Sequence, residues 1–204
     1  GSRGSSEFAE IPAGISGGWD GYRGTPNLVR LFDFINNDSP MASQIIDHRG
    51  IFFDKNRIID ITTSVTGTFT TEGWAVYKYT NMRSDGQAGS NTTFPDTDFP
   101  MFRLGDVYLM YAEAVARGGQ GGSMDSAVSY VNALRKRAYG DDSHAIDANW
   151  LQANNYRNIL DERGRELYWE GVRRTDLIRY GLFTSSNYLW TFKGGVLGGV
   201  GVDS

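Results

Sequence analysis

RNILDERGRELYWEGVRRTDLIRYG, residues 157–181, is the stretch that decides how the rest of the chain is interpreted. Glu162, Glu166 and Glu170 recur at every fourth position. On a helix this spacing places the three carboxylates along one face, about 6 Å apart per step. Such a row has three possible uses: a catalytic carboxylate set, a metal site, or a structural network of ion pairs.

Arginines in the same stretch favour the structural network. The expected pairs, at three or four residues' distance, are Glu162 with Arg165, Arg163 with Glu166, Glu170 with Arg173 and Arg174, and Asp176 with Arg173 and Arg179. Pairing with arginine keeps a carboxylate ionised, whereas the general acid of a glycoside hydrolase must hold its proton. Arginines also compete for the oxygens that a metal ion would need. We therefore predict that the chain has no catalytic residue and no metal ligand here.

Composition excludes several other classes of protein. The 204 residues carry a net charge of -4, which gives no broad basic surface for nucleic acid. The absence of cysteine removes disulfides, thiolate metal sites and cysteine nucleophiles. The two histidines, His48 and His144, have no metal-ligand spacing, and no apolar run approaches the 18 to 20 residues of a membrane-spanning helix. We expect no metal and no cofactor.

The first half of the chain is expected to be irregular with some β-structure. Thr25 and Pro26 are typical of a helix start, and the apolar spacing predicts a short helix that ends at Asn36 and Asn37. Residues 51–81 are rich in β-branched and aromatic side chains, which predicts short strands with Trp74 in the core. A polar loop, residues 83–100, follows.

The second half is expected to be helical. One helix precedes Gly118 and Gly119, and its predicted inner face is Leu104, Val107, Tyr108, Tyr111, Ala112 and Val115. The next runs from the N-cap Ser123 to Gly140, with Ala127, Val131 and Leu134 inside, and forms an antiparallel hairpin with the first. A third helix is predicted from Ile159 to Tyr180. The fold class is mostly α with minor β, divided into residues 1–100, residues 101–183 and a Gly-rich tail, 184–204.

The segment GGWDGYRGTPN, residues 17–27, is the candidate ligand loop. Glycines around Trp19 and Tyr22 let large rings stand out from the backbone, and Asp20 and Arg23 offer hydrogen bonds beside them. An aromatic platform next to polar groups suits a sugar, whose C–H face stacks on the ring while its hydroxyls pair at the rim. The alternative is that Trp19 and Tyr22 fill the core beneath the loop.

Two stretches together resemble the SusD/RagB family. FPMFRLGDVYLMYAEAVAR, residues 99–117, and ILDERGRELYWEGVRRTDLIRYG, residues 159–181, are similar to the C-terminal half of that family. GGWDGYRGTPNLVRLF, RIIDITTSV and YKYTN follow the family's order as well. The resemblance covers residues 17–183, and its most specific part is the pair of long motifs.

The resemblance implies a mostly helical fold with tetratricopeptide-like helix pairs. It also implies that the family's N-terminal helices and its lipidated cysteine lie outside this fragment. It implies an outer-membrane, cell-surface lipoprotein of Bacteroidetes that binds oligosaccharide without cleaving it. It also implies a partner, a SusC-like TonB-dependent transporter. An alternative is a protein–protein interaction subunit that caps the transporter and takes a peptide or another non-glycan ligand. An exposed apolar patch or a self-association surface is expected on the helices.

In starch-binding members of this family, an aromatic residue near the place in the chain that Trp19 occupies here contributes to glycan binding. The resemblance therefore favours Trp19 as the stacking residue, with Asp20, Tyr22 and Arg23 beside it as further ligand-binding residues.

Overall fold

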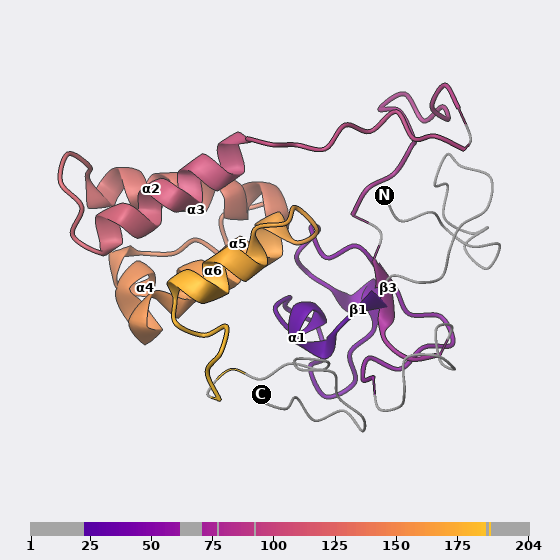
Figure 1. Cartoon of the computed structure of the whole chain (residues 1–204), viewed down its shortest axis with the longest axis horizontal. Helices are drawn as coiled ribbons and strands as arrows, with labels where there is room; N and C mark the ends of the chain where they lie inside the picture. Colours follow the sequence, from indigo (N-terminus) through magenta and orange to yellow (C-terminus); the bar gives the residue numbers. More distant parts are fainter. Residues whose placement is uncertain (1–22, 62–70, 77, 92, 187, 189–204) are drawn as a thin grey trace.

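The computed structural model describes residues 23–61, 71–76, 78–91, 93–186 and 188, which form two parts. Helices between residues 104 and 179 form one part, and a small sheet with its loops forms the other (Figure 1). An extended segment leads from the sheet to the first long helix. The prediction of a mostly α-helical chain with minor β-structure is confirmed.

The small sheet is built from three very short strands. β1 (Arg23–Gly24), β2 (Phe52–Phe53) and β3 (Trp74–Val76) pair antiparallel in the order β1-β3-β2. Trp74 is 2% exposed and packs its ring against Phe34 and Phe52, which confirms its prediction as a core residue. So small a sheet depends on packing against other elements for its stability.

α1 (Pro26–Val29) is shorter than predicted. The chain beyond Arg30 turns and becomes extended, so that Phe34 bridges Ile45 while Ile35 is 75% exposed. The predicted start of this helix, with Thr25 as N-cap and Pro26 at the first position, is therefore confirmed, but its predicted end at Asn36 and Asn37 is wrong. Phe32 and Phe34 are two residues apart, and both are buried. Side chains two residues apart point to the same face of an extended strand but to nearly opposite sides of a helix, so this burial fits extended backbone.

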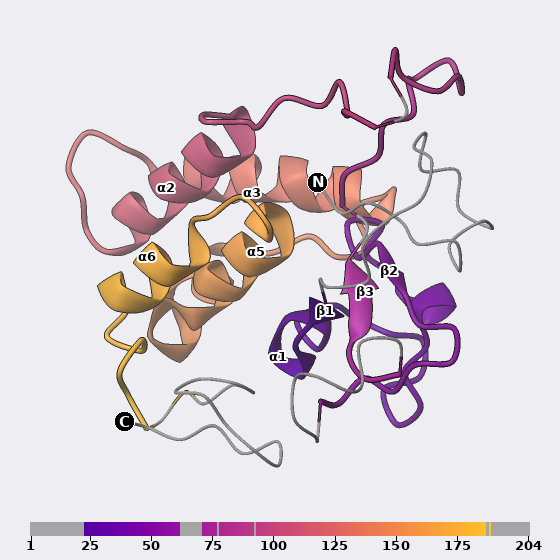
Figure 2. The same cartoon turned by 45° about the vertical axis from the view of Figure 1, so that its right-hand side comes forward.

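α2 (Leu104–Ala116) and α3 (Met124–Tyr139) lie side by side as the predicted hairpin (Figures 1 and 2). The Ser123 hydroxyl accepts a hydrogen bond from the Ser126 N–H at 3.2 Å, and Gly140 ends α3 with φ 87°. Ala127, Val131 and Leu134 are buried as predicted. The cap, the stop and the inner face of α3 are thus confirmed.

The predicted inner face of α2 is only partly correct. Ala112 is buried, and Tyr108, Tyr111 and Val115 pack against the core, but Leu104 and Val107 face outward. The residues that occupy the core beside Ala112 are Leu109 and Ala116. α2 is apolar on most of its circumference, so the spacing of apolar residues alone does not determine which side faces inward.

α4 (Ala148–Gln152) and the 3-10 segment η3 (Ala153–Tyr156) lead into α5. Asn154, Asn155 and Tyr156 have φ values of 54°, 53° and 63°, a left-handed turn that reverses the chain. Asparagine tolerates this conformation better than other non-glycine residues. The turn brings α5 back against α2.

α5 (Arg157–Leu167) and α6 (Arg173–Arg179) replace the single helix predicted from Ile159 to Tyr180. The chain breaks at Trp169 and Gly171, whose φ values are 65° and 79°. Tyr168, at the break, packs its ring against Phe32 and Phe52 of the sheet part. The end of α5 therefore reaches from the helical part into the core of the sheet part. No helix within the described ranges is long and apolar enough to span a membrane.

Candidate functional site

The predicted ligand loop meets the described structure at Arg23. Trp19, Asp20 and Tyr22 lie outside the described residues. Arg23 sits in β1, an edge strand of the sheet, and its Nη1 donates to the Glu72 carbonyl oxygen at 2.9 Å. Burial lowers the pKa of Arg23, although the charge of Glu72 opposes that shift. Arg23 thus fastens the strand that the candidate loop enters.

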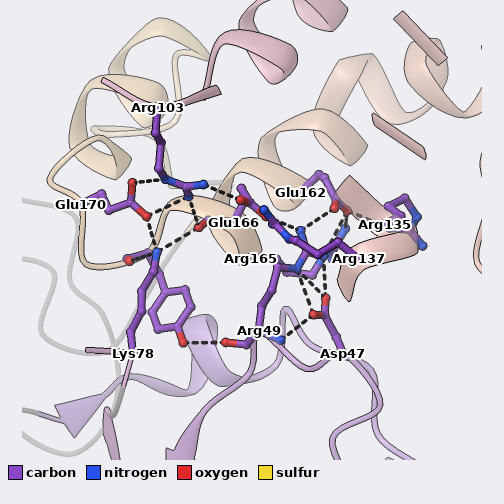
Figure 3. A network of polar contacts seen from close by, with 11 residues as sticks. Asp47, Arg49, Lys78, Arg103, Arg135, Arg137, Glu162, Arg165, Glu166 and Glu170 are labelled. Carbon is purple, nitrogen blue, oxygen red and sulfur yellow. Dashed lines mark hydrogen bonds and ion pairs between the residues drawn. The ribbon is translucent and has the colours of Figure 1, made fainter. Parts of the chain in front are cut away.

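Glu162 is a fully buried member of a charged network that joins the two parts (Figure 3). Its side chain is 0% exposed and receives three arginines. Arg49 Nη1 donates to Oε1 at 2.8 Å, while Arg135 Nη1 and Arg165 Nη2 both donate to Oε2 at 2.7 Å. Every donor is charged, so these are hydrogen bonds of the strong, charge-assisted kind.

Glu166 and Glu170 extend this network along the end of α5. Glu166 accepts from Arg103 at 2.5 Å, from Arg137 at 2.5 Å and from Arg49 at 2.9 Å. Glu170 accepts two bonds from Arg103, at 2.6 and 2.8 Å, and pairs with Lys78. Both carboxylates are therefore bound by cations that come mainly from distant segments of the chain.

Arg49 connects the sheet part to α5. Its Nη1 donates to both Glu162 and Glu166, while Nε and Nη2 donate to the fully buried Asp47 at 2.9 and 2.6 Å. The Tyr168 hydroxyl adds a bond to the Arg49 carbonyl at 2.6 Å. One guanidinium thus neutralises carboxylates from two regions that are more than a hundred residues apart in sequence.

Lys78 and Arg103 explain why α5 ends where it does. Lys78 Nζ donates to the carbonyl oxygens of Glu166 and Tyr168 at 2.9 and 2.7 Å, and Arg103 Nη2 donates to the Glu166 carbonyl at 2.6 Å. The last carbonyls of a helix have no partner within it, and cations there also complement the helix dipole. Two side chains from outside the helix therefore satisfy its C-terminus.

The network holds its carboxylates in the ionised form. Burial alone would raise the pKa of Glu162, but the charges of Arg165, Arg49 and Arg135 outweigh burial and lower it to about 2. Hydrogen bonds from Arg103, Arg137 and Arg49 likewise overcome burial and lower the pKa of Glu166 to about 2. Neither group can donate a proton to a substrate at neutral pH, and neither is exposed to one.

Lowering the pH below 5 is expected to remove the stabilisation that Glu162 and Glu166 provide. Both pKa values are lower in the folded chain than the ordinary value of 4.5, so the unfolded chain takes up protons first as the pH falls. The stabilisation is therefore present above about pH 5 and lost by about pH 2, at about 3 kcal/mol per carboxylate. Urea unfolding at a series of pH values measures it. A stability unchanged between pH 6 and pH 2.5 would contradict the ionised network.

The partners of the carboxylates differ from those predicted. Glu162 does pair with Arg165, and Asp176 with Arg179. The predicted pairs of Arg163 with Glu166 and of Glu170 with Arg173 and Arg174 are wrong, as is that of Asp176 with Arg173. Arg163 instead binds Asp106 and Asp176, both at 2.8 Å. Since the chain breaks after Leu167, Glu170 no longer lies on the helix that would have aligned it with those arginines.

A cavity that the sequence did not indicate lies between α1 and the α5–α6 break. Its volume is about 330 Å³, and its walls are mainly apolar, formed among others by Leu28, Leu31, Trp169, Leu177 and Phe183. Arg173 and Arg174 also line it. The walls come from segments far apart in the sequence, so no local motif could have revealed the cavity. Among the described residues, no group of three His, Cys, Asp or Glu side chains is arranged to hold a metal ion.

Comparison with known proteins gives consistent results. The sequence model of the SusD family matches residues 59–197. The chain is 44% identical over 134 residues to the starch-binding protein SusD of Bacteroides thetaiotaomicron, covering 66% of this chain and 22% of that protein. It is 39% identical over 87 residues to a SusD-like protein of Formosa agariphila, covering 40% of this chain and 15% of that one.

Among solved structures, a SusD-like protein of Bacteroides fragilis matches with a TM-score of 0.49 and 19% identity, covering 85% of this chain and 38% of that structure. The match to the first curated relative extends over about a fifth of that protein's length. The family sequence model, in contrast, matches well over half of the present chain. The chain therefore belongs to the SusD family.

Proposed function

We propose that this chain is part of a non-catalytic, cell-surface protein that binds oligosaccharide for uptake. The observation that carries the proposal is the 44% identity to a starch-binding protein over 134 residues. The structure supports the absence of catalysis, because Glu162 and Glu166 are buried, ionised and bound by arginines. A hydrolase would need one carboxyl group that keeps its proton beside the substrate.

The proposed partner is a SusC-like TonB-dependent transporter, and the proposed location is the outer membrane, through a lipid anchor at the N-terminus of the complete protein. Membership of the SusD family supports both. The glycan is proposed to stack on Trp19, with Asp20, Tyr22 and Arg23 as polar neighbours. The position of Arg23 on an edge strand is compatible with a loop that begins at the margin of the sheet.

Isothermal titration of the complete protein against a panel of oligosaccharides, beginning with maltooligosaccharides, tests glycan binding. Saturable binding without the appearance of new reducing ends supports the proposal. Turnover that Glu170→Gln abolishes would instead indicate a hydrolase. Absence of binding to every glycan, together with stable co-purification with the transporter, would favour a capping subunit with a peptide or another non-glycan ligand.

Trp19→Ala is expected to weaken glycan binding by about tenfold or more with an unchanged melting temperature. An aromatic side chain at the centre of a contact surface commonly contributes at least 1.4 kcal/mol, which corresponds to tenfold in Kd. Phe94→Ala is the matched control, because Phe94 is 69% exposed on another loop. A fall in melting temperature in Trp19→Ala without a specific loss of affinity would assign Trp19 to the core instead.

A further inference from the structure

The exposed apolar patch expected on the helices is present on the outer side of α2. Leu104, Val107 and Met110 are 61%, 48% and 48% exposed, and their spacing of three residues places them on one side of the helix. None of the residues that the structure describes covers this patch, and self-association through it stays a prediction. A different accessible apolar surface lies inside the fold, and there a neighbouring segment of the chain leads directly to it.

That second surface is the cavity between α1 and the α5–α6 break, which we refer to as the α1–α6 cavity. Leu28 and Leu31 of the sheet part form one wall, and Trp169 and Leu177 of the helical part form another. Leu28, Leu31 and Trp169 are only half-buried, so apolar surface of both parts stays accessible across the cavity. Contiguous apolar surface of this kind marks a place where another group binds.

The walls of the α1–α6 cavity are held in place by contacts outside it. Arg165 Nη1 donates to the Leu31 carbonyl oxygen at 2.8 Å, and a Cβ atom at Gly164 would lie only 2.5 Å from Leu31 Cδ1. Trp169 has a φ of 65°, a conformation that a bulky residue keeps only where its surroundings impose it. Lys78 Nζ supplies part of that constraint, because it donates to the adjacent Tyr168 carbonyl at 2.7 Å. The cavity is therefore preformed.

Tyr188, the last described residue, lies on the wall of the α1–α6 cavity. Its hydroxyl accepts a hydrogen bond from Arg173 Nη2 at 2.7 Å. The guanidinium carbons of Arg157 and Arg173 lie 5.6 and 5.9 Å from the centre of its ring, and its N–H bonds the Ser185 carbonyl at 3.4 Å. Because Tyr188 is anchored at the cavity, the residues that follow it start there.

The sequence after Tyr188 is rich in aromatic and apolar residues. Leu189, Trp190, Thr191 and Phe192 come next, and they lie outside the described residues. In an extended segment, Trp190 and Phe192 share the face of Tyr188, and two residues of extended chain cover about 7 Å. Trp190 is thus within reach of the cavity that Tyr188 already lines. The family sequence model matches through residue 197, so this segment belongs to the part of the chain that the family shares.

We propose that the α1–α6 cavity binds the segment that follows Tyr188, residues 189–192, with the indole of Trp190 between the leucines of α1 and Trp169. A volume of about 330 Å³ is in the range of pockets that hold small organic molecules, and an indole ring is of that size. The arginines of the cavity favour the same occupant. Arg174 already lies over the Phe183 ring at 4.9 Å, and indole is the strongest side-chain partner for such a cation.

A segment bound in this way joins the two parts of the fold a second time, independently of the charged network around Glu162. α1 (Pro26–Val29) begins two residues after Gly24, the last residue of β1. β1 is the strand that the candidate ligand loop enters. A bound segment that holds α1 against α5 and α6 therefore also supports the base of that loop. The inference itself does not depend on glycan binding.

Photo-cross-linking from position 190 tests where the segment binds. The complete protein carries p-benzoylphenylalanine in place of Trp190, and the cross-linked peptides are identified by mass spectrometry after irradiation. Most cross-links are expected in peptides that contain residues 26–31 and 164–177, which supply the walls of the cavity. The same group in place of Phe94, which is 69% exposed on another loop, is the matched control and should not label these peptides.

Indole provides a second test, because a small aromatic molecule fills the space that an absent aromatic side chain leaves. Trp190→Ala in the complete protein should melt several degrees below the parent. Added indole should raise the melting temperature of Trp190→Ala by a few degrees, since a ligand that binds only the folded state stabilises it. The parent and Phe94→Ala should not respond, because Trp190 occupies the cavity in both.

Three results would overturn the proposal. Cross-links from position 190 that fall mainly outside residues 26–31 and 164–177 would place the segment elsewhere, and this test does not require Trp190→Ala to fold. A Trp190→Ala variant with the melting temperature of the parent would show that the indole is not buried. Indole that stabilises the parent as much as Trp190→Ala would show that the cavity is open and takes a ligand from outside the chain.

Discussion

Glu162→Gln is expected to lower the free energy of unfolding by about 3 to 5 kcal/mol. This is a large part of the roughly 5 to 15 kcal/mol by which an ordinary folded domain is stable. Glutamine has the shape of glutamate but replaces one accepting oxygen with an NH₂ donor. Both oxygens of Glu162 accept bonds from arginine, so the amide must turn a donor toward Arg49 or toward Arg135 and Arg165. It also leaves three guanidinium groups around a neutral, fully buried side chain. Urea denaturation at pH 7 measures the loss.

Asp142→Asn provides the matched control for Glu162→Gln. Asp142 pairs with Lys136 at 2.7 Å, but the two side chains are 68% and 59% exposed. An exposed pair contributes at most about 1 kcal/mol, so the same acid-to-amide change should have little effect there. The difference between Glu162→Gln and the parent chain should also shrink toward pH 2, where Glu162 of the parent becomes protonated. A loss below 1 kcal/mol at pH 7 would show that the three arginines are satisfied without this charge.

Arg49→Met is expected to cost a similar 3 to 5 kcal/mol and to weaken the connection between the sheet part and the helical part. Methionine fills the space of the aliphatic stem but provides none of the N–H groups. Glu162 and Glu166 keep other arginines, whereas Asp47, which is 0% exposed, loses its bonds from the Arg49 side chain. The uncompensated charge of Asp47 therefore dominates the cost. Thermal unfolding measures the loss of stability. It is followed by circular dichroism, which reports mainly on the helices, and by tryptophan fluorescence.

A second substitution distinguishes the uncompensated charge of Asp47 from the loss of packing around residue 49. Asp47→Asn combined with Arg49→Met removes the buried charge and should recover part of the stability, because a neutral amide costs less to bury than a carboxylate. Arg83→Met is the control in the same part of the fold, since Arg83 and its partner Asp85 are 64% and 51% exposed. If the double variant is no more stable than Arg49→Met alone, the destabilisation comes from packing.

Elements with local signals could be predicted from the sequence. Ser123 caps α3 with its own side chain, and Gly140 ends α3 because it can take a positive φ. Both signals lie within a residue of the helix end that they determine. The inner face of α3 could also be predicted, because polar residues on its other side leave one orientation for Ala127, Val131 and Leu134.

The break between α5 and α6 was not predicted, because most of its cause lies elsewhere in the chain. Residues 157–179 continue the helical spacing, Trp169 is not a helix-breaking residue, and an isolated glycine such as Gly171, whose φ is 79°, is also tolerated within a helix. Lys78 and Arg103 bind the carbonyls at the end of α5, and both come from outside residues 157–179. Tyr168 also gains a place in the aromatic core of the sheet part. Tertiary contacts therefore outweighed the local preference to continue the helix.

The partners of the carboxylates, like the helix break, depend on distant segments of the chain and could be predicted only in part. Their structural role could be inferred from the density of arginines, and their ionised state follows from the observed bonds. Most of their partners, however, are Arg49, Arg103, Arg135 and Arg137, which no spacing within residues 157–181 could identify. The proposed ligand residues Trp19, Asp20 and Tyr22 lie outside the described residues and stay predictions.

Sharing of ions in this network limits how the sequence can evolve. In an isolated ion pair, exchanging the two charges restores the interaction. Exchanging Arg49 and Glu162 would instead place a new carboxylate beside Asp47 and Glu166, and a new cation beside Arg135 and Arg165. Neither reversing one charge nor exchanging one pair therefore gives every remaining ion in the network a partner of opposite charge. We expect charge reversals in this arrangement of glutamate and arginine to be tolerated far less often than changes in the exposed loops.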